Sequence, residues 1–251
     1  MVEAKAFHTP SAVASEQAAS RERGYGFLAW LFLEGPDIPF LERMLDADVG
    51  SAVASLAAGG TAHPLIIAGL NEMRGWLAAQ AHLPLEQIRQ ELAVQGTWLF
   101  RGIALGYGPP PPYEAVHRRP GTGGDAETLL RIRRFYREAA ADPPPNSHER
   151  LDHLGIELDF MRFLCGEESR LWLENDAGEA IRYRRMERRF LAEHLMAWAP
   201  EYCQRILAEP CAPFFHGLVK VLSGFLGGDA RLLDGAEEQD GVKDPDPASV
   251  R

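Results

Sequence analysis

The sequence predicts an all-α protein, a single helical-bundle domain of about ten helices joined by connections rich in proline and glycine. Apolar side chains recur at helical spacing through most of the 251 residues, and these stretches end at glycine or proline. Alternating runs of β-branched residues, which would indicate strands, do not occur in the sequence. The hydrophobic share of 46% is enough to build one full core.

The first part of the chain is expected to contain five helices after a loose arm. Asp37 is suited to cap the second helix, and Pro64 and Pro84 are acceptable where later helices begin. Gly24 and Gly26 weaken the middle of the first helix. The expected ranges are 1–15 for the arm and 16–34, 37–45, 51–58, 63–81 and 84–105 for the helices.

A proline-rich stretch follows at residues 106–113, where four consecutive prolines cannot lie inside a helix. They should form a stiff polyproline II segment. This segment is either a rigid connector or a wall on which Tyr107 and Tyr113 offer amphipathic contact surface. A short helical turn is expected over 114–119. The glycine-rich stretch at 121–125 lacks the Gly-Lys-Ser/Thr ending of a phosphate-binding loop, so we interpret it as a linker.

Four further helices are expected in the second part of the chain. One begins at Asp125 and is stopped by the prolines at 143–145, and a long one is kinked or divided by Pro200. The long helix is expected over 179–207. The other two helices are expected over 146–173 and over 214–226, and two glycines end the last one. The helical domain then covers 16–228, with lobes at about 16–142 and 146–228, and residues 229–251 form an acidic, disordered tail.

The composition limits the function classes. A net charge of −10 argues against nucleic-acid binding, because phosphate contacts need a basic surface. The three cysteines show no CxxC spacing, so neither a disulfide framework nor a structural zinc site is expected. The first residues do not have the pattern of a secretory signal, and no stretch is apolar over the length of a membrane span. These features favour a cytoplasmic protein.

The helix expected from Asn146 combines an apolar stripe with acidic and histidine residues. Asn146 is suited to the N-cap position, and Glu149 would complete a capping box. Asp152, His153 and Glu157 lie at the edge of the stripe, and His153 and Glu157 are spaced to pair on the helix surface. The simplest interpretation is a solvated helix edge. The functional interpretation is a surface that binds a partner that is both apolar and basic.

Catalytic motifs are missing from the sequence. It contains neither an HExxH zinc motif nor a Gly-x-Ser-x-Gly nucleophile elbow. A binding module without a cofactor is therefore favoured over an enzyme. One alternative from another class stays open, a helical metal-dependent enzyme that would use His153, Glu157 and His194.

The segment from Asp152-His153 through Glu157-Leu158 to Phe160-Met161 resembles the signature of the TorD/DmsD/NarJ-like redox-enzyme maturation chaperones. Other segments resemble this family in order and rough spacing, from about residue 25 to 228. They are Leu99-Phe100, Gly108-Pro109, Pro111-Pro112-Tyr113-Glu114, and the looser pattern from Phe190 to Pro200.

The resemblance implies an all-helical cytoplasmic chaperone that binds the twin-arginine signal peptide of a molybdoenzyme subunit. It would hold the subunit until the molybdopterin cofactor is inserted, and then allow export. Carried over residue by residue, Phe100, Pro112, Tyr113, Asp152 and His153 correspond to positions implicated in peptide binding. The spacing between Phe100 and Pro112 is slightly expanded here, which changes the expected shape of the groove.

The chemistry of such a peptide agrees with this expectation. Carboxylates such as Asp152, Glu157 or Glu114 would receive the two arginines, and Phe100 and Tyr113 would bury the apolar run that follows. The expected partners are the molybdoenzyme subunit and its signal peptide, with the chaperone as a monomer or homodimer. The proline-rich segment hints at a client of the dimethyl-sulfide, ethylbenzene, chlorate or selenate enzyme type. A second alternative is an assembly chaperone of a non-exported nitrate-reductase-type subunit.

Overall fold

The structure is a computed structural model that describes residues 10–60, 62–101, 108–118, 125–143 and 149–240. These ranges contain eleven α-helices and one π-helical segment, with no β-strand. The all-α prediction is confirmed. The elements are α1 (Pro10–Leu33), α2 (Ile38–Leu45), α3 (Ala47–Gly59), α4 (Pro64–Ala79), α5 (Leu85–Phe100), α6 (Glu114–His117), α7 (Asp125–Glu138), α8 (Leu154–Leu173), α9 (Ala177–Phe190), η1 (Leu191–Leu195), α10 (Met196–Leu207) and α11 (Pro213–Asp240).

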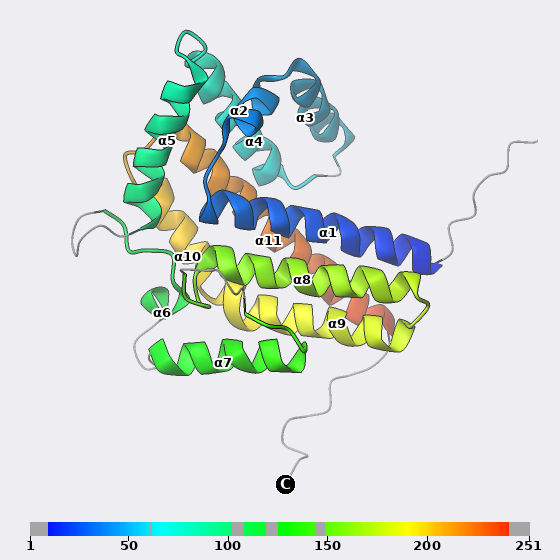
Figure 1. Ribbon diagram of the computed structural model, residues 1–251. Coiled ribbons are helices and arrows are strands. Elements are labelled where there is room, and N and C mark those ends of the chain that lie inside the picture. The colour runs from blue at the N-terminus through cyan, green and yellow to red at the C-terminus, as the bar shows by residue number, and fades with distance from the viewer. Residues whose placement is uncertain (1–9, 61, 102–107, 119–124, 144–148, 241–251) are drawn as a thin grey trace, which may run out of the picture.

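Helices from the first part of the chain pack against helices from the second part. Helix α1 lies along α8, and α8 in turn packs on α9 (Figure 1). Helix α4 lies along α11, so the helices α2 to α5 are attached to the last helix of the described residues. The two ranges predicted as lobes are therefore interleaved around one shared core, because the apolar faces of α1 and α4 are covered by helices from the second range.

The packing of α4 on α11 depends on glycines that let two backbones approach closely. A Cβ atom on Gly69 would lie 2.4 Å from the carbonyl oxygen of Gly217, and one on Gly217 would lie 2.5 Å from the carbonyl oxygen of Gly69. Neither distance is possible for a real side chain, so any larger residue would push the helices apart.

Helix α1 begins earlier than predicted and is continuous. Residues 10–15 belong to the helix rather than to an arm, because Ser15 is buried and its hydroxyl donates to the carbonyl oxygen of Ser169, 3.1 Å away. Residues 1–9 lie outside the described part of the chain. Gly24 does not interrupt the helix, since its missing side chain makes room for the ring of Phe225.

Helix α11 continues past Gly227 and Gly228 to Asp240, so the predicted start of a disordered tail at 229 is wrong. The reason is a buried polar network. The guanidinium of Arg21 binds Asp229 at 2.5 Å, and the hydroxyl of Tyr25 donates to the same carboxylate at 2.6 Å. Leu233 is also buried. These contacts outweigh the low helix propensity of the two glycines.

Three boundaries in the middle of the chain also differ from the prediction. Helix α5 ends at Phe100 and α7 at Glu138, both earlier than expected. Helix α8 begins at Leu154, with His153 as its N-cap, so the predicted start at residue 146 is wrong. Asn146 itself lies outside the described residues, as do Tyr107 and most of the glycine-rich stretch at 121–125.

The helix predicted over 179–207 is divided as expected, but the division lies before Pro200. A π-helical turn spans Leu191–Leu195, and Pro200 lies inside α10. Asp37 caps α2 as predicted, because its side chain accepts from the amide of Phe40. Among the described residues, no helix combines the length and apolar character that crossing a membrane requires.

Candidate functional site

The proline-rich segment and the residues before α8 are joined by backbone pairing. The amide of Leu154 donates to the carbonyl oxygen of Pro112, and the amide of Glu114 donates to the carbonyl oxygen of Asp152, each at 2.8 Å. Tyr113 and His153 thereby form an isolated antiparallel bridge. The pairing brings the Pro-Pro-Tyr-Glu and Asp-His motifs together, although they are far apart in the sequence.

His153 has a structural position in this pairing. Its Nδ1 accepts from the amide of Gly155 at 3.1 Å and so caps α8. Burial lowers the pKa of His153 to about 4, with a smaller contribution in the same direction from the charge of Arg101, and Glu149 acts against both. The predicted surface pair of His153 with Glu157 does not form, because His153 precedes the helix and Glu157 faces the interior.

Asp152 is already bound to an arginine of the same chain. Both carboxylate oxygens accept from the guanidinium of Arg150, each at 2.9 Å, and one also accepts from the amide of Ala115 at 3.3 Å. The guanidinium lies over the ring of Tyr113, 5.3 Å from its centroid, and also reaches Asp125 at 3.1 Å. The side chain of Asp152 is 0% exposed, whereas that of Arg150 is 39% exposed.

Tyr113 links this pair to a neighbouring groove. Its hydroxyl donates to Glu149 at 2.5 Å, and burial together with this hydrogen bond raises the pKa of Tyr113 to about 12. Glu149 also lies 3.7 Å from the guanidinium of Arg101. Arg101 forms part of the lining of a groove between the end of α1 and α5.

Phe100 lies at the floor of this groove rather than on an open surface. Its ring packs edge-on against Phe32 and Phe215, with centroids 5.2 and 5.5 Å away. Leu33 and Leu92 contribute further apolar lining. Phe100 and Tyr113 are therefore on the same side of the molecule, connected through Arg101 and Glu149.

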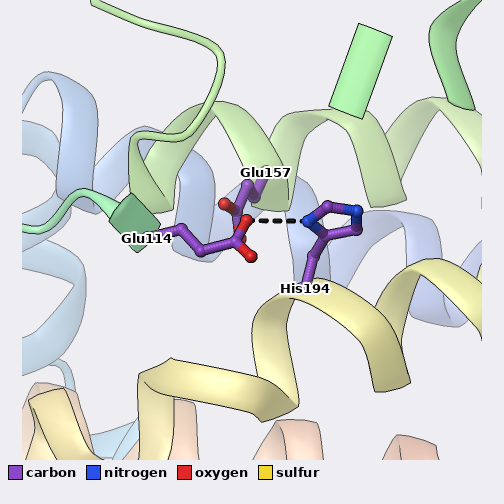
Figure 2. Close-up of side chains that lie close together, drawn as sticks. All are labelled: Glu114, Glu157 and His194. Atoms are coloured by element: carbon purple, nitrogen blue, oxygen red, sulfur yellow. Dashed lines mark hydrogen bonds and ion pairs between the residues drawn. The ribbon is translucent and has the colours of Figure 1, made fainter. Parts of the chain in front are cut away.

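Glu114 and Glu157 meet His194 in the interior, where the three side chains come from α6, α8 and η1 (Figure 2). All three are 0% exposed, so neither Glu114 nor Glu157 is accessible to receive an arginine of a peptide, contrary to the expectation. The Nδ1–H of His194 donates to Glu114 at 2.7 Å, and the indole N–H of Trp198 donates to Glu157 at 3.1 Å. The π-helical turn is the element that carries His194 to this position.

The two carboxyl groups have opposite pKa shifts. Burial alone would raise the pKa of Glu114, but the hydrogen bond from His194 and the charges of His194 and Arg118 outweigh it and hold the pKa below its usual value. Burial and the neighbouring Glu114 charge raise the pKa of Glu157 well above its usual value. Glu157 is therefore the protonated partner and Glu114 the ionised one.

The cluster of Glu114, Glu157 and His194 also bears on the metal-dependent alternative. Their ligand atoms lie within 4.8 Å of one another, and His153 is not part of the group. The guanidinium of Arg118 lies 2.5 Å from Glu114 and already supplies a positive charge there. The Arg118 charge and the His194 hydrogen bond together compensate the charge of Glu114, and the proton on Glu157 leaves the second carboxyl group neutral.

Sequence reasoning missed the roles of Arg150, Arg118 and Trp198. Arg150 stands two residues before Asp152, and that spacing alone does not indicate a bidentate pair. Trp198 and His194 belong to the Phe190–Pro200 pattern, whose periodicity was the available signal. Their partner Glu114 is distant in sequence, so only the fold brings them together.

A family model described as nitrate reductase delta subunit matches residues 67–204, more than half of the chain. The chain belongs to this family. The expected kinship with TorD/NarJ-like maturation chaperones is confirmed by this match and by the relatives described next.

Three relatives are named as chaperones. The perchlorate reductase assembly chaperone protein of Dechloromonas aromatica is 32% identical over 124 residues, covering 48% of this chain and 51% of the relative. The selenate reductase assembly chaperone protein of Thauera selenatis is 37% identical over 105 residues, covering 42% and 52%. The chaperone protein TorD of Aeromonas salmonicida is 29% identical over 154 residues, covering 58% and 59%. The chain thus spans about half the length of these relatives.

All three relatives are named as chaperones, which agrees with the expectation that the chain is not an enzyme. The matched range includes Phe100, the Pro112–Glu114 segment, Asp152, Glu157 and His194. Most of the residues that build the site therefore lie in the part of the chain that defines the family.

Proposed function

We propose that the chain is a cytoplasmic chaperone that binds the twin-arginine signal peptide, or the N-terminal region, of a molybdopterin-containing oxidoreductase subunit. It holds that subunit while the cofactor is inserted and before export. The names of the relatives favour this function, and those that assemble perchlorate and selenate reductases favour a client of the oxyanion-reductase type.

The observation that carries the proposal is the continuity between a charged patch and a groove whose lining is partly apolar. Tyr113 and Arg150 form the patch over the buried carboxylate of Asp152, and Phe100 lies at the floor of the groove. Arg101 and Glu149 connect the two. A leader segment with arginines followed by apolar residues has the matching order of chemistry, since carboxylates bind guanidinium groups and the apolar residues of the groove can bury apolar side chains.

The other predicted site residues are buried and hold in place the backbone that carries Tyr113 and Asp152. Pro112 and His153 fix the paired backbone on which Tyr113 is displayed. Glu114 and Glu157 anchor that backbone to η1 and α10 through His194 and Trp198. In this proposal Tyr113 and Asp152 contact the peptide, Phe100 borders its apolar part, and the remaining residues position them.

Calorimetry with a twin-arginine leader peptide tests the function. We expect binding of the arginine peptide, and weaker binding when both arginines are changed to lysine or to alanine, because only a guanidinium group makes the bidentate contact. Asp152→Asn should weaken binding of the arginine peptide alone. Asp159→Asn is a matched control, since Asp159 also pairs with an arginine near the α8 surface. Equal binding of all three peptides would refute the role of the arginines.

The second candidate is assembly of a non-exported nitrate-reductase-type subunit through an N-terminal segment without paired arginines. The family description favours it, and so does the fact that Asp152 already has an arginine partner. A leader peptide without arginines that binds as tightly as the arginine form would decide for this candidate.

A further inference from the structure

We propose that Asp152 and Tyr113 form a receptor for one guanidinium group, that Arg150 fills it in the free protein, and that an arginine of the client takes the place of Arg150. The inference rests on the proposed function and adds to it the contact that the client must displace.

The bound guanidinium of Arg150 defines the receptor. Its Nε and Nη2 atoms donate to the two oxygens of Asp152, each at 2.9 Å, in the parallel arrangement that matches a carboxylate. The face of the Tyr113 ring covers the same guanidinium at 5.3 Å. A carboxylate in the plane and an aromatic ring above it are the two contacts that distinguish a guanidinium from an ammonium group.

The receptor does not depend on Arg150 for its assembly. The backbone of Asp152 is held by the amide of Glu114 at 2.8 Å, and its carboxylate is oriented by the amide of Ala115 at 3.3 Å. Tyr113 is held by its bridge to His153 and by its hydrogen bond to Glu149. These contacts remain when the Arg150 side chain moves away.

Arg150 is also free to leave without rearranging the fold. It precedes α8, its guanidinium contacts only the side chains of Asp125, Asp152 and Tyr113 among the described residues, and the side chain is 39% exposed. Its departure would uncover a buried carboxylate, which is costly unless another cation arrives. Replacement of the Arg150 guanidinium by an arriving guanidinium group is therefore favoured over departure of Arg150 alone.

The exchange has two consequences for recognition. The internal arginine competes with the client, so the apparent affinity for a leader is reduced by the fraction of protein in which the receptor is open. It also discriminates against lysine, because an ammonium group cannot replace both the paired hydrogen bonds and the ring contact that Arg150 gives up.

Small cations test the receptor without any peptide. In Arg150→Ala, we expect N-ethylguanidinium at low millimolar concentration to raise the thermal midpoint more than ethylammonium does. The wild-type protein and Arg170→Ala should show no such difference. Arg170 is a suitable control because it lies on α8, is 48% exposed and also binds two carboxylate groups. Equal effects of the two cations on Arg150→Ala would overturn the receptor.

Peptide binding tests the exchange. We expect Arg150→Ala to bind the twin-arginine leader on the order of tenfold more tightly than the wild type does, with no gain for the lysine peptide. Arg150→Gln keeps a hydrogen-bond donor for Asp152, and it replaces Arg150→Ala in this test if the alanine variant does not fold. Arginine-dependent binding by the wild type without a gain in either variant would overturn the exchange and leave the proposed function intact. Absence of leader binding by all variants would overturn the proposed function, and the exchange with it.

Discussion

Tyr113 and His153 face each other across an isolated antiparallel bridge, with their rings packed edge to face and centroids 5.2 Å apart. This bridge attaches the proline-rich segment to the start of α8. It explains why an Asp-His pair and a Pro-Pro-Tyr-Glu segment belong to one site, since each supplies the hydrogen-bond partner of the other. The bridge lies between the partly exposed Arg150 and the buried Glu114, and so connects the proposed peptide surface to the core.

Replacing His153 tests its role as a cap. His153→Ala removes the acceptor of the Gly155 amide and the ring that packs on Tyr113, so we expect a loss of about 1–3 kcal/mol in the free energy of unfolding. His153→Asn should retain part of the stability, because an asparagine oxygen can accept the same hydrogen bond. Urea unfolding at neutral pH measures both. Equal losses in the two variants would show that the cap contributes little.

Acid should weaken the same contact. The pKa of His153 in the folded protein is about 4, below its ordinary value near 6.5, so folding favours the neutral ring. The contribution of His153 is complete above pH 6.5 and is lost as the pH falls towards 4, because protonated Nδ1 cannot accept from Gly155. We expect the wild-type stability to decline over this interval more steeply than that of His153→Asn. Parallel pH profiles would contradict the assignment.

Sequence reasoning reached the fold class and most helices because apolar periodicity, proline and glycine report local structure. It placed the start of α8 eight residues early, since Asn146 and Glu149 match a capping box and the true cap, His153, is not a usual capping residue. It ended α11 at Leu226, because a sequence does not show that Arg21 binds Asp229. The candidate site residues were grouped by resemblance, but burial of Glu114 and Glu157 depends on partners in η1 and α10 that lie far along the chain.

Substitutions at the buried carboxyl pair should have unequal effects. Glu157 is the protonated member, so Glu157→Gln replaces a neutral group by a neutral group of the same shape and should not destabilise the protein by more than about 1 kcal/mol. Glu114→Gln removes the charge that Arg118 and His194 bind, and should cost about 3–5 kcal/mol. Urea unfolding at pH 7 distinguishes them.

The pH profile provides a check on that assignment. A raised pKa in the folded state means that the contribution of Glu157 is complete below about pH 4.5 and is lost as the pH rises towards the folded-state value. Glu157→Gln should lack this decline. A Glu157→Gln variant as unstable as Glu114→Gln would show that both groups are ionised and that the pair is held in another way.

The extension of α11 should be required for stability. Arg21 contacts Glu168 at 3.1 Å and both Glu187 and Asp229 at 2.5 Å, and Arg184 also binds Glu168. Three carboxyl groups thus face two guanidinium groups. Burial raises the pKa of Glu187 to about 8 although Arg21 opposes it, so the cluster is neutral at pH 7 when Glu187 keeps its proton.

This charge balance predicts different losses in the free energy of unfolding for substitution of Asp229 and for truncation before it. In Asp229→Asn, Glu187 can ionise and restore neutrality, so we expect a loss of only about 1–3 kcal/mol. Truncation after Gly228 also removes the buried Leu233 and the helical backbone that carries both residues, and should cost at least about 3 kcal/mol more. Thermal and urea unfolding measure the difference. Deletion of 241–251 is the control, since it removes none of these contacts. A protein truncated after Gly228 that is as stable as this control would show that residues 229–240 do not contribute to the folded core.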